Sequence, residues 1–237
     1  MARVLANMGF LEPSSCDTKP WIIDPNIRVF ISMPGSVTQR QIALAVLAER
    51  GIARLAELRR AGVTAATMSR MERDREVIRL ARGLYQLPDA ELDVNHSLAE
   101  AAKRSPKAVI CLVSALAFHG LTDQLPRQVW LAIGSKDWAP KPDGMPIRVV
   151  RFTQPLLSEG VEIHTIEGVP VKIFGVAKTI ADCFRYRNKI GLSVAIEGLQ
   201  EALRKRSATP GEIANQAVRG GVGTVIRPYI EALTVNG

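Results

Sequence analysis

The chain has 237 residues, of which 47% are hydrophobic and 23% are charged, and its formal net charge is +8 at pH 7. A chain of this length and composition can bury the cores of two compact domains, which excludes a disordered protein. The positive charge makes nucleic acid the first class of partner to consider.

The sequence has no features that indicate a membrane span or an oxidising compartment. Its longest apolar run, residues 108–118, is well short of the roughly 20 residues that a membrane span needs. The cysteines Cys16, Cys111 and Cys183 are odd in number and widely spaced, which is typical of reduced thiols rather than of disulfides or zinc ligands. We therefore expect a cytoplasmic protein with no membrane partner.

The first 35 residues show no sustained periodicity, contain four prolines and carry balanced charge. This composition predicts a flexible N-terminal tail over residues 1–35. Met33 stands just before the first helix signal, so a translation start at Met33 stays open as an alternative.

Three helical patterns follow in quick succession. Two overlapping capping boxes, Ser36–Gln39 and Thr38–Gln41, begin the first helix, and Gly51 ends it. Residues 53–61 form a second pattern, and Gly62 supplies a left-handed stop. This spacing predicts a helix-turn-helix.

Thr64 is placed to cap the third helix, in which Met68, Met71 and Arg75 fall near one face. The opposite face is small, polar and basic: Ala66, Ser69, Arg70 and Arg73. In a helix-turn-helix this third helix enters the major groove of DNA. A face that is merely solvated stays open as the alternative.

Two short β-prone runs, 77–80 and 84–87, flank a turn and predict a hairpin wing with Arg79 and Arg82 near its tip. Gly83 is suited to the positive φ that such a turn needs. Residues 36–90 are thus predicted to form a winged helix-turn-helix. We expect DNA contacts from a set of hydroxyl and guanidinium side chains: Thr64, Thr67, Ser69, Arg70, Arg73, Arg79 and Arg82.

Charge is concentrated in the same segment. Between Thr38 and Pro88, ten arginines and five carboxylates leave a net charge of +5, and lysine is absent. The planar guanidinium fork suits phosphate and guanine better than a general surface requires. A bias towards arginine codons stays open as the alternative.

From Ser97 onwards charge thins and β-branched residues become more frequent. We expect a helix at 97–104, a buried segment at 109–120, and strands at 129–133, 147–151, 161–166 and 169–173. Helices should follow at 177–187, 192–206, 210–218 and 224–233. Strands followed by helices predict a mixed α/β domain at 95–237, and the whole chain is assigned to the α+β class.

The sequence offers little material for catalysis. The histidines His96, His119 and His164 lack metal-ligand spacing, and a buried hydrogen-bonded imidazole is the commoner role for His119. The loop Gly134–Asp137 has one carboxylate where a nucleotidyltransferase needs a pair, and a nuclease-type triplet occurs only at Asp17–Lys19 in the tail. No enzyme activity, cofactor or metal is expected.

A charged cluster on the predicted helix at 177–187 has two interpretations. Its members are Lys178, Asp182, Arg185 and Arg187. They are spaced either for an intrahelical ion-pair ladder or for a surface that faces a partner. The sequence does not separate the two.

Three motifs in order resemble the AbiEi family of type IV antitoxins. They are Ala81–Asp89, Ser114–Thr122 with the following Leu125 and Pro126, and Lys178–Arg187 with Lys189–Gly191. The similarity runs over roughly residues 36–235, whereas the N-terminal tail departs from the family pattern.

The resemblance implies an antitoxin whose winged helix represses its own operon by binding inverted repeats in promoter DNA. It further implies a C-terminal domain that counters a nucleotidyltransferase toxin without forming a stable complex. An effector-responsive winged-helix repressor unrelated to a toxin is the alternative.

Overall fold

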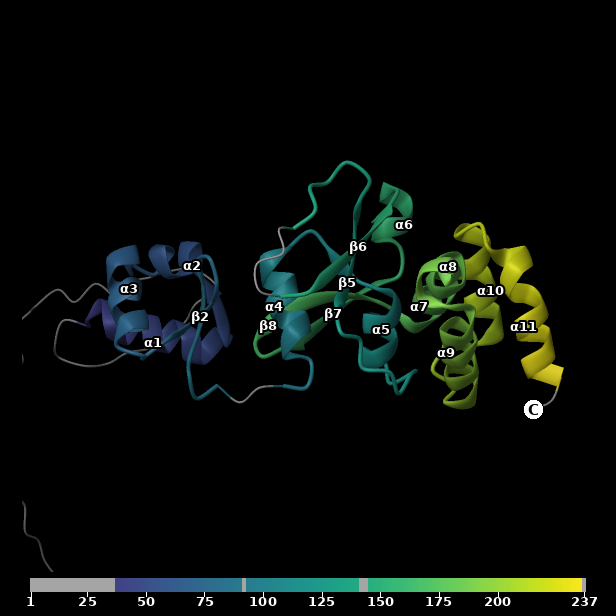
Figure 1. The fold of residues 1–237 in the computed structure, drawn as a ribbon, viewed down its shortest axis with the longest axis horizontal. Helices are drawn as coiled ribbons and strands as arrows, with labels where there is room; N and C mark the ends of the chain where they lie inside the picture. Colours follow the sequence, from purple (N-terminus) through teal and green to yellow (C-terminus); the bar gives the residue numbers. More distant parts are fainter. Residues whose placement is uncertain (1–36, 91–92, 141–144, 236–237) are drawn as a thin grey trace, which may run out of the picture. The chain divides into compact units, whose positions relative to one another are not determined.

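The computed structural model describes residues 37–90, 93–140 and 145–235 (Figure 1). The described residues from 37 onwards belong to one compact unit, and their helices and two sheets confirm the α+β class. The expected tail, Cys16 and the capping box at Ser36 lie outside the described residues. The boundary expected between residues 90 and 95 stays a prediction.

The first elements of the described chain form a winged helix-turn-helix. They are α1 (Gln39–Arg50), β1 (Ile52–Arg54), α2 (Leu55–Arg60), α3 (Ala65–Arg73), β2 (Ile78–Ala81) and β3 (Leu84–Gln86). The strands pair antiparallel in the order β1-β3-β2. Strand β1 was not expected, and it delays the second helix from Ala53 to Leu55.

Local signals place these elements as the sequence predicts. Thr38 and Gln41 form a reciprocal capping box at the start of α1, and the Thr64 hydroxyl accepts a hydrogen bond from the Thr67 amide at the start of α3. Gly62 and Gly83 adopt φ of 92° and 70°, a region that residues with a Cβ rarely occupy. The turn before α3 and the turn of the wing therefore form where glycine permits them.

The wing sheet is buried on both faces. Ala53 and Tyr85 pack into the core of the three helices, whereas their neighbours Ile52 and Leu84 pack into a second core with residues of the following helix and sheet. This division follows from the alternation of side chains along a strand. Strand alternation thus makes the winged helix-turn-helix continuous with the rest of the compact unit.

A five-stranded sheet forms the centre of the remaining chain, in the order β6-β5-β4-β8-β7. The elements up to its last strand are α4 (His96–Arg104), β4 (Val109–Ile110), α5 (Leu112–Phe118), β5 (Val129–Gly134), β6 (Ile147–Phe152), α6 (Gln154–Ser158), β7 (Val161–Ile166) and β8 (Val169–Phe174). The pairs β4–β8 and β5–β6 are parallel, and the others are antiparallel. The expected hairpin at Glu167 and Gly168 joins β7 to β8.

Both faces of this sheet are covered. All six residues of β5 are buried; Trp130 packs towards the C-terminal helices, and Leu131 packs towards α4 and the wing. A strand that is buried on both faces has a continuous apolar run, which explains why residues 129–133 predicted a strand without polar alternation.

The last described part of the chain forms five helices, which are drawn in green to yellow in Figure 1. They are α7 (Val176–Arg185), α8 (Arg187–Ile190), α9 (Leu192–Arg204), α10 (Pro210–Arg219) and α11 (Gly223–Val235). Helix α7 is the most enclosed of these, because every residue from Lys178 to Phe184 is buried. The expected order of strands and then helices is confirmed, although α6 and the separate α8 were not anticipated.

Candidate nucleic-acid interface

Helix α3 presents a basic face because its apolar side chains anchor the opposite face. Met68 and Met71 are completely buried among the three helices, whereas Ser69, Arg70 and Arg73 are exposed. Arg73 lies four positions after Ser69 and three after Arg70, so the helical repeat projects these side chains from one side. The Arg73 side chain is 76% exposed and can reach a large partner.

Arg75 does not lie where the sequence pattern predicted. Helix α3 ends at Arg73, Asp74 is its C-cap, and Arg75 adopts a φ of 60°. The reversal of the backbone takes Arg75 off the inner face and leaves it exposed. The prediction that Arg75 joins Met68 and Met71 is therefore wrong, because the helical repeat stops before it.

The first residue of α1 holds the start of α3. The Gln39 side-chain oxygen accepts hydrogen bonds from the Thr64 amide at 3.1 Å, the Thr64 hydroxyl at 3.0 Å and the Thr67 hydroxyl at 2.6 Å. Thr64 and Thr67 therefore orient the helix as well as bordering its exposed face. Sequence reasoning missed Gln39, because no local pattern links it to residues that lie 25 and 28 positions further along.

The wing strand lies beside the last turn of α3. Arg79 is 3.9 Å from the Glu72 carboxylate, and its Nε donates to the Ala81 carbonyl at 3.3 Å. Arg82 is exposed at the turn that precedes Gly83. Arg79 therefore lies next to α3, and the DNA contacts expected of Arg79 and Arg82 stay a prediction.

Not every arginine of the segment contributes to this face. Arg40 forms ion pairs with Asp74 and with Glu76, the latter at 2.7 Å, which ties α1 to the segment after α3. Arg50 and Arg54 line an inner cluster with Glu57. The net charge of +5 counted along the sequence therefore overstates the charge that the outer face can offer to DNA.

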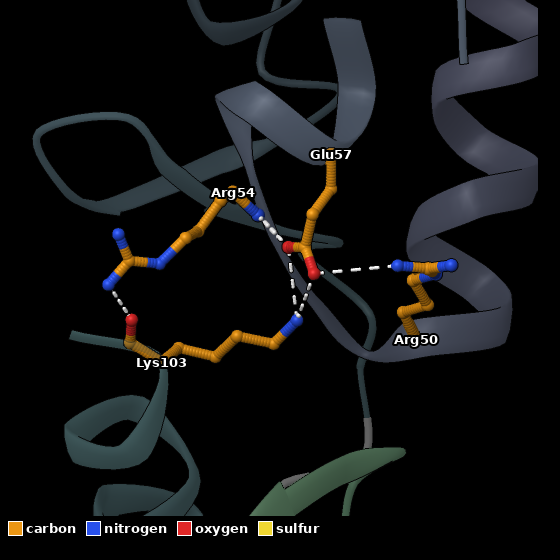
Figure 2. Close-up of polar contacts among 4 residues, drawn as sticks. All are labelled: Arg50, Arg54, Glu57 and Lys103. Carbon is orange, nitrogen blue, oxygen red and sulfur yellow. Dashed lines mark hydrogen bonds and ion pairs between the residues drawn. The ribbon is translucent and has the colours of Figure 1, made fainter. Parts of the chain in front are cut away.

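Figure 2 shows the inner cluster, in which the Glu57 carboxylate is the common acceptor. It accepts from Lys103 Nζ at 2.9 and 3.0 Å, from the Arg54 amide at 2.6 Å and from Arg50 at 3.4 Å. Burial acts to raise the pKa of Glu57, but the Arg54 amide and the Lys103 ammonium outweigh it and lower that pKa. An Arg54 guanidinium nitrogen also donates to the Lys103 carbonyl.

The charged cluster on α7 is largely inside the protein. Lys178 and Asp182 are 2% and 1% exposed, and Lys178 Nζ donates to the two Asp182 oxygens at 2.6 and 2.7 Å. The interpretation as a partner-facing surface is wrong for these two residues, because the neighbouring sheet and helices cover α7. Burial raises the pKa of Asp182 to about 6.

The other two members of that cluster are half-buried and hydrogen-bonded to the backbone. Arg185 donates to the Gly220 carbonyl at 3.2 Å, and Arg187 donates to the Phe184 carbonyl at 3.0 Å. Both interactions connect the helices of the C-terminal region to one another.

The described side chains that were considered for catalysis have structural partners, whereas Asp17–Lys19 lie outside the described residues. His119 is half-buried rather than buried, and its Nε2 donates to the Phe174 carbonyl at 2.8 Å. The Asp137 carboxylate accepts from the Gly134 amide at 3.0 Å. Within the described ranges, no group of His, Cys, Asp or Glu side chains could hold a metal ion. None of the helices that the structure describes is long and apolar enough to cross a membrane.

The fold and the basic face of α3 define a winged helix-turn-helix protein. Residues 40–88 match the family model described as "Transcriptional regulator, AbiEi antitoxin", which confirms the resemblance to AbiEi antitoxins over this region. No curated protein matches the sequence.

Among solved structures, the chain is similar to the RV2827C protein from Mycobacterium tuberculosis, with a TM-score of 0.54. The two are 12% identical, and the similarity covers 75% of this chain and 70% of the other. At this identity the likeness concerns the fold alone.

Proposed function

We propose that this chain is the antitoxin of a type IV toxin–antitoxin system and represses its own operon. The winged helix-turn-helix binds inverted repeats in the promoter, and the region from residue 95 onwards counters a nucleotidyltransferase toxin. No stable complex with the toxin is required. The match of residues 40–88 to AbiEi regulators supports the regulatory part of this proposal.

The observation that carries DNA binding is the division of α3 into two faces. Met68 and Met71 fix the helix from inside, while Arg70 and Arg73 remain exposed on the other side. Arginine on a helix in the major groove can bind guanine with two hydrogen bonds, and arginines on a wing can bind phosphates. The shorter hydroxyl side chains of Ser69, Thr64 and Thr67 offer further hydrogen bonds to DNA at the same edge of α3.

Promoter binding is tested with a DNA fragment from upstream of the chain's own gene. Retention of this fragment in a mobility-shift assay, with a scrambled fragment as the control, is the expected result. One winged helix per chain predicts half-sites about one or two helical turns apart. Equal retention of both fragments would contradict sequence-specific binding to an operator and would show non-specific binding alone.

The antitoxin part is tested by co-expression with the adjacent gene. Expression of a neighbouring nucleotidyltransferase alone should arrest growth, and simultaneous expression of this chain should relieve the arrest. Growth arrest that persists at full expression of this chain would contradict the antitoxin role. Promoter retention without a toxic neighbour would instead favour the effector-responsive repressor.

A further inference from the structure

A cavity of about 460 Å³ lies where the winged helix-turn-helix meets α4 and the β7–β8 hairpin. Its volume falls in the range of small-molecule sites, roughly 300–1,000 Å³. The ends of α1 and β1 contribute Arg50 and Arg54, and α4 and β8 contribute Lys103 and Lys172. The DNA-binding face of α3 does not line it.

The charge of the lining is strongly positive. Four basic side chains surround the cavity and one carboxylate, Glu57, opposes them, so the formal charge is +3. Glu57 is occupied by Lys103 and Arg50 (Figure 2). Lys172 is exposed, and the hydrogen bond that its Nζ makes within the described part of the chain is a long one, 3.5 Å to the Pro106 carbonyl. The cavity therefore keeps a positive charge that Glu57 does not neutralise.

Arg54, one of the residues that line the cavity, carries a donor without a partner among the described residues. The Nε atom of Arg54 is buried and forms no hydrogen bond with any residue that the structure describes. A buried donor without an acceptor is costly, and most such groups in proteins find a protein, water or ligand partner. An anionic oxygen is the acceptor that suits a guanidinium best.

The remainder of the lining is apolar. Pro106, Ile163, Val169 and Pro170 contribute hydrocarbon surface beside the basic side chains, and Ile163 is 68% exposed. A bare inorganic anion would leave this surface unused. A ligand with an anionic group and a flat or apolar body would use both parts of the cavity.

We propose that this cavity binds a small phosphomonoester that carries a ring, which is the chemistry of a nucleoside monophosphate. The phosphate contacts Lys172 and the arginines, and the ring packs against the prolines and Ile163. The occupant would touch both the helix-turn-helix and the central sheet region. The site is separate from the DNA-binding face and goes beyond the proposed antitoxin function.

Isothermal titration calorimetry on the full chain tests the proposal with AMP, inorganic phosphate and adenosine as probes. We expect saturable binding of AMP, weaker binding of phosphate and the weakest binding of adenosine. Lys172→Gln should weaken AMP binding roughly tenfold, the effect of one lost charge-assisted hydrogen bond. Lys172→Glu should weaken it further, because it reverses the charge at an exposed strand position.

Arg73→Gln is the matched control, since it removes one exposed positive charge on α3 rather than in the cavity. AMP binding should survive Arg73→Gln, and promoter retention should survive Lys172→Gln. Four results would overturn the proposal: no saturable AMP binding, adenosine or phosphate binding as tightly as AMP, unchanged AMP binding in Lys172→Glu, or loss of AMP binding in Arg73→Gln. The last result would place AMP on the DNA-binding face.

Discussion

Helices α3 and α7 both combine an apolar face with charged side chains spaced three or four residues apart. In α3, Arg70 and Arg73 are exposed, and Arg73 forms an ion pair of 3.7 Å with the neighbouring Asp74. In α7, Lys178 and Asp182 are buried and bind each other. The same kind of sequence pattern thus produces a surface in one helix and an internal ion pair in the other.

The difference comes from the number of neighbours that cover each helix. Helix α3 packs on the core of α1 and the wing through Met68 and Met71. Helix α7 packs against α5, α9 and α10, and the Lys178 ammonium lies 5.0 Å from the ring centres of Phe152 and Phe174. Accessibility is therefore a tertiary property that the periodicity of one helix does not report.

The largest expected effect is the loss of promoter affinity with rising salt concentration. It tests whether the exposed face of α3 contacts DNA phosphates. If the basic face neutralises about six phosphates, promoter affinity should fall by about 10³ between about 50 and 200 mM salt. Filter binding or a mobility-shift titration measures this slope. A flat response would contradict DNA as the partner of this face.

Lys178→Met tests the buried ion pair of α7. It leaves the Asp182 carboxylate buried without its ion-pair partner, which should lower the free energy of unfolding by about 3–5 kcal/mol in urea titrations. The control is Arg227→Met, which removes a pair with Glu231 in which both side chains are mostly exposed. Such a pair is worth at most about 1 kcal/mol, so an equal cost in both variants would contradict a buried α7 pair.

The pH dependence of stability also tests the burial of Asp182. Burial raises the pKa of Asp182 to about 6, against about 3.9 for an aspartate in an unfolded chain. The folded state thus holds an extra proton between these values, so the contribution of Asp182 to stability is greatest below about pH 4 and is lost as pH rises through 6. A shift of about two pKa units corresponds to about 3 kcal/mol.

The variant Lys178→Met/Asp182→Leu isolates this contribution, because it replaces both charges with apolar side chains. Unfolding free energies of the natural chain and of the variant are compared between about pH 4 and pH 7. The stability of the natural chain relative to the variant should fall by about 3 kcal/mol across this window. A difference that is constant with pH would contradict the titration assigned to Asp182.

Gln39→Ala should have the smallest of these effects, on the α3 side. The threonines that Gln39 binds at the start of α3 are close to solvent, so water can replace its side chain and the stability cost should be about 1 kcal/mol. Promoter affinity should fall a few-fold, because the start of α3 loses an anchor. Gln200→Ala, at an exposed position of α9, is the control; equal affinities of the two variants would contradict the positioning role of Gln39.

Local signals made much of the winged helix-turn-helix predictable. Thr64 caps α3, Gly83 forms the wing turn, and the spacing of Met68 and Met71 identifies the inner face. Each of these features depends on residues within a few positions of one another. The exposed basic face of α3 could therefore be deduced from the sequence, although its contact with DNA stays a prediction.

The features that the sequence did not reveal depend on distant residues. Strand β1 is three residues long and exists because it pairs with β3 some 30 positions later. Arg54 turns inward towards Lys103, which is 49 positions away, and the Lys178 ammonium lies beside the ring of Phe152, which is 26 positions earlier. No local pattern encodes these contacts. Charge counted along the sequence therefore overestimates the charge that is exposed at the surface.

The central claim is that the exposed arginines of α3 bind the operator, and a mobility-shift assay on Arg70→Ala/Arg73→Ala tests it most directly. Arg204→Ala/Arg227→Ala is the matched control, because these arginines are 66% and 78% exposed on α9 and α11. The α3 variant should lose at least about a hundredfold in promoter affinity with an unchanged midpoint of thermal unfolding, while the control retains the fragment. Retention of the promoter by a folded α3 variant, at the affinity of the natural chain, would contradict the account.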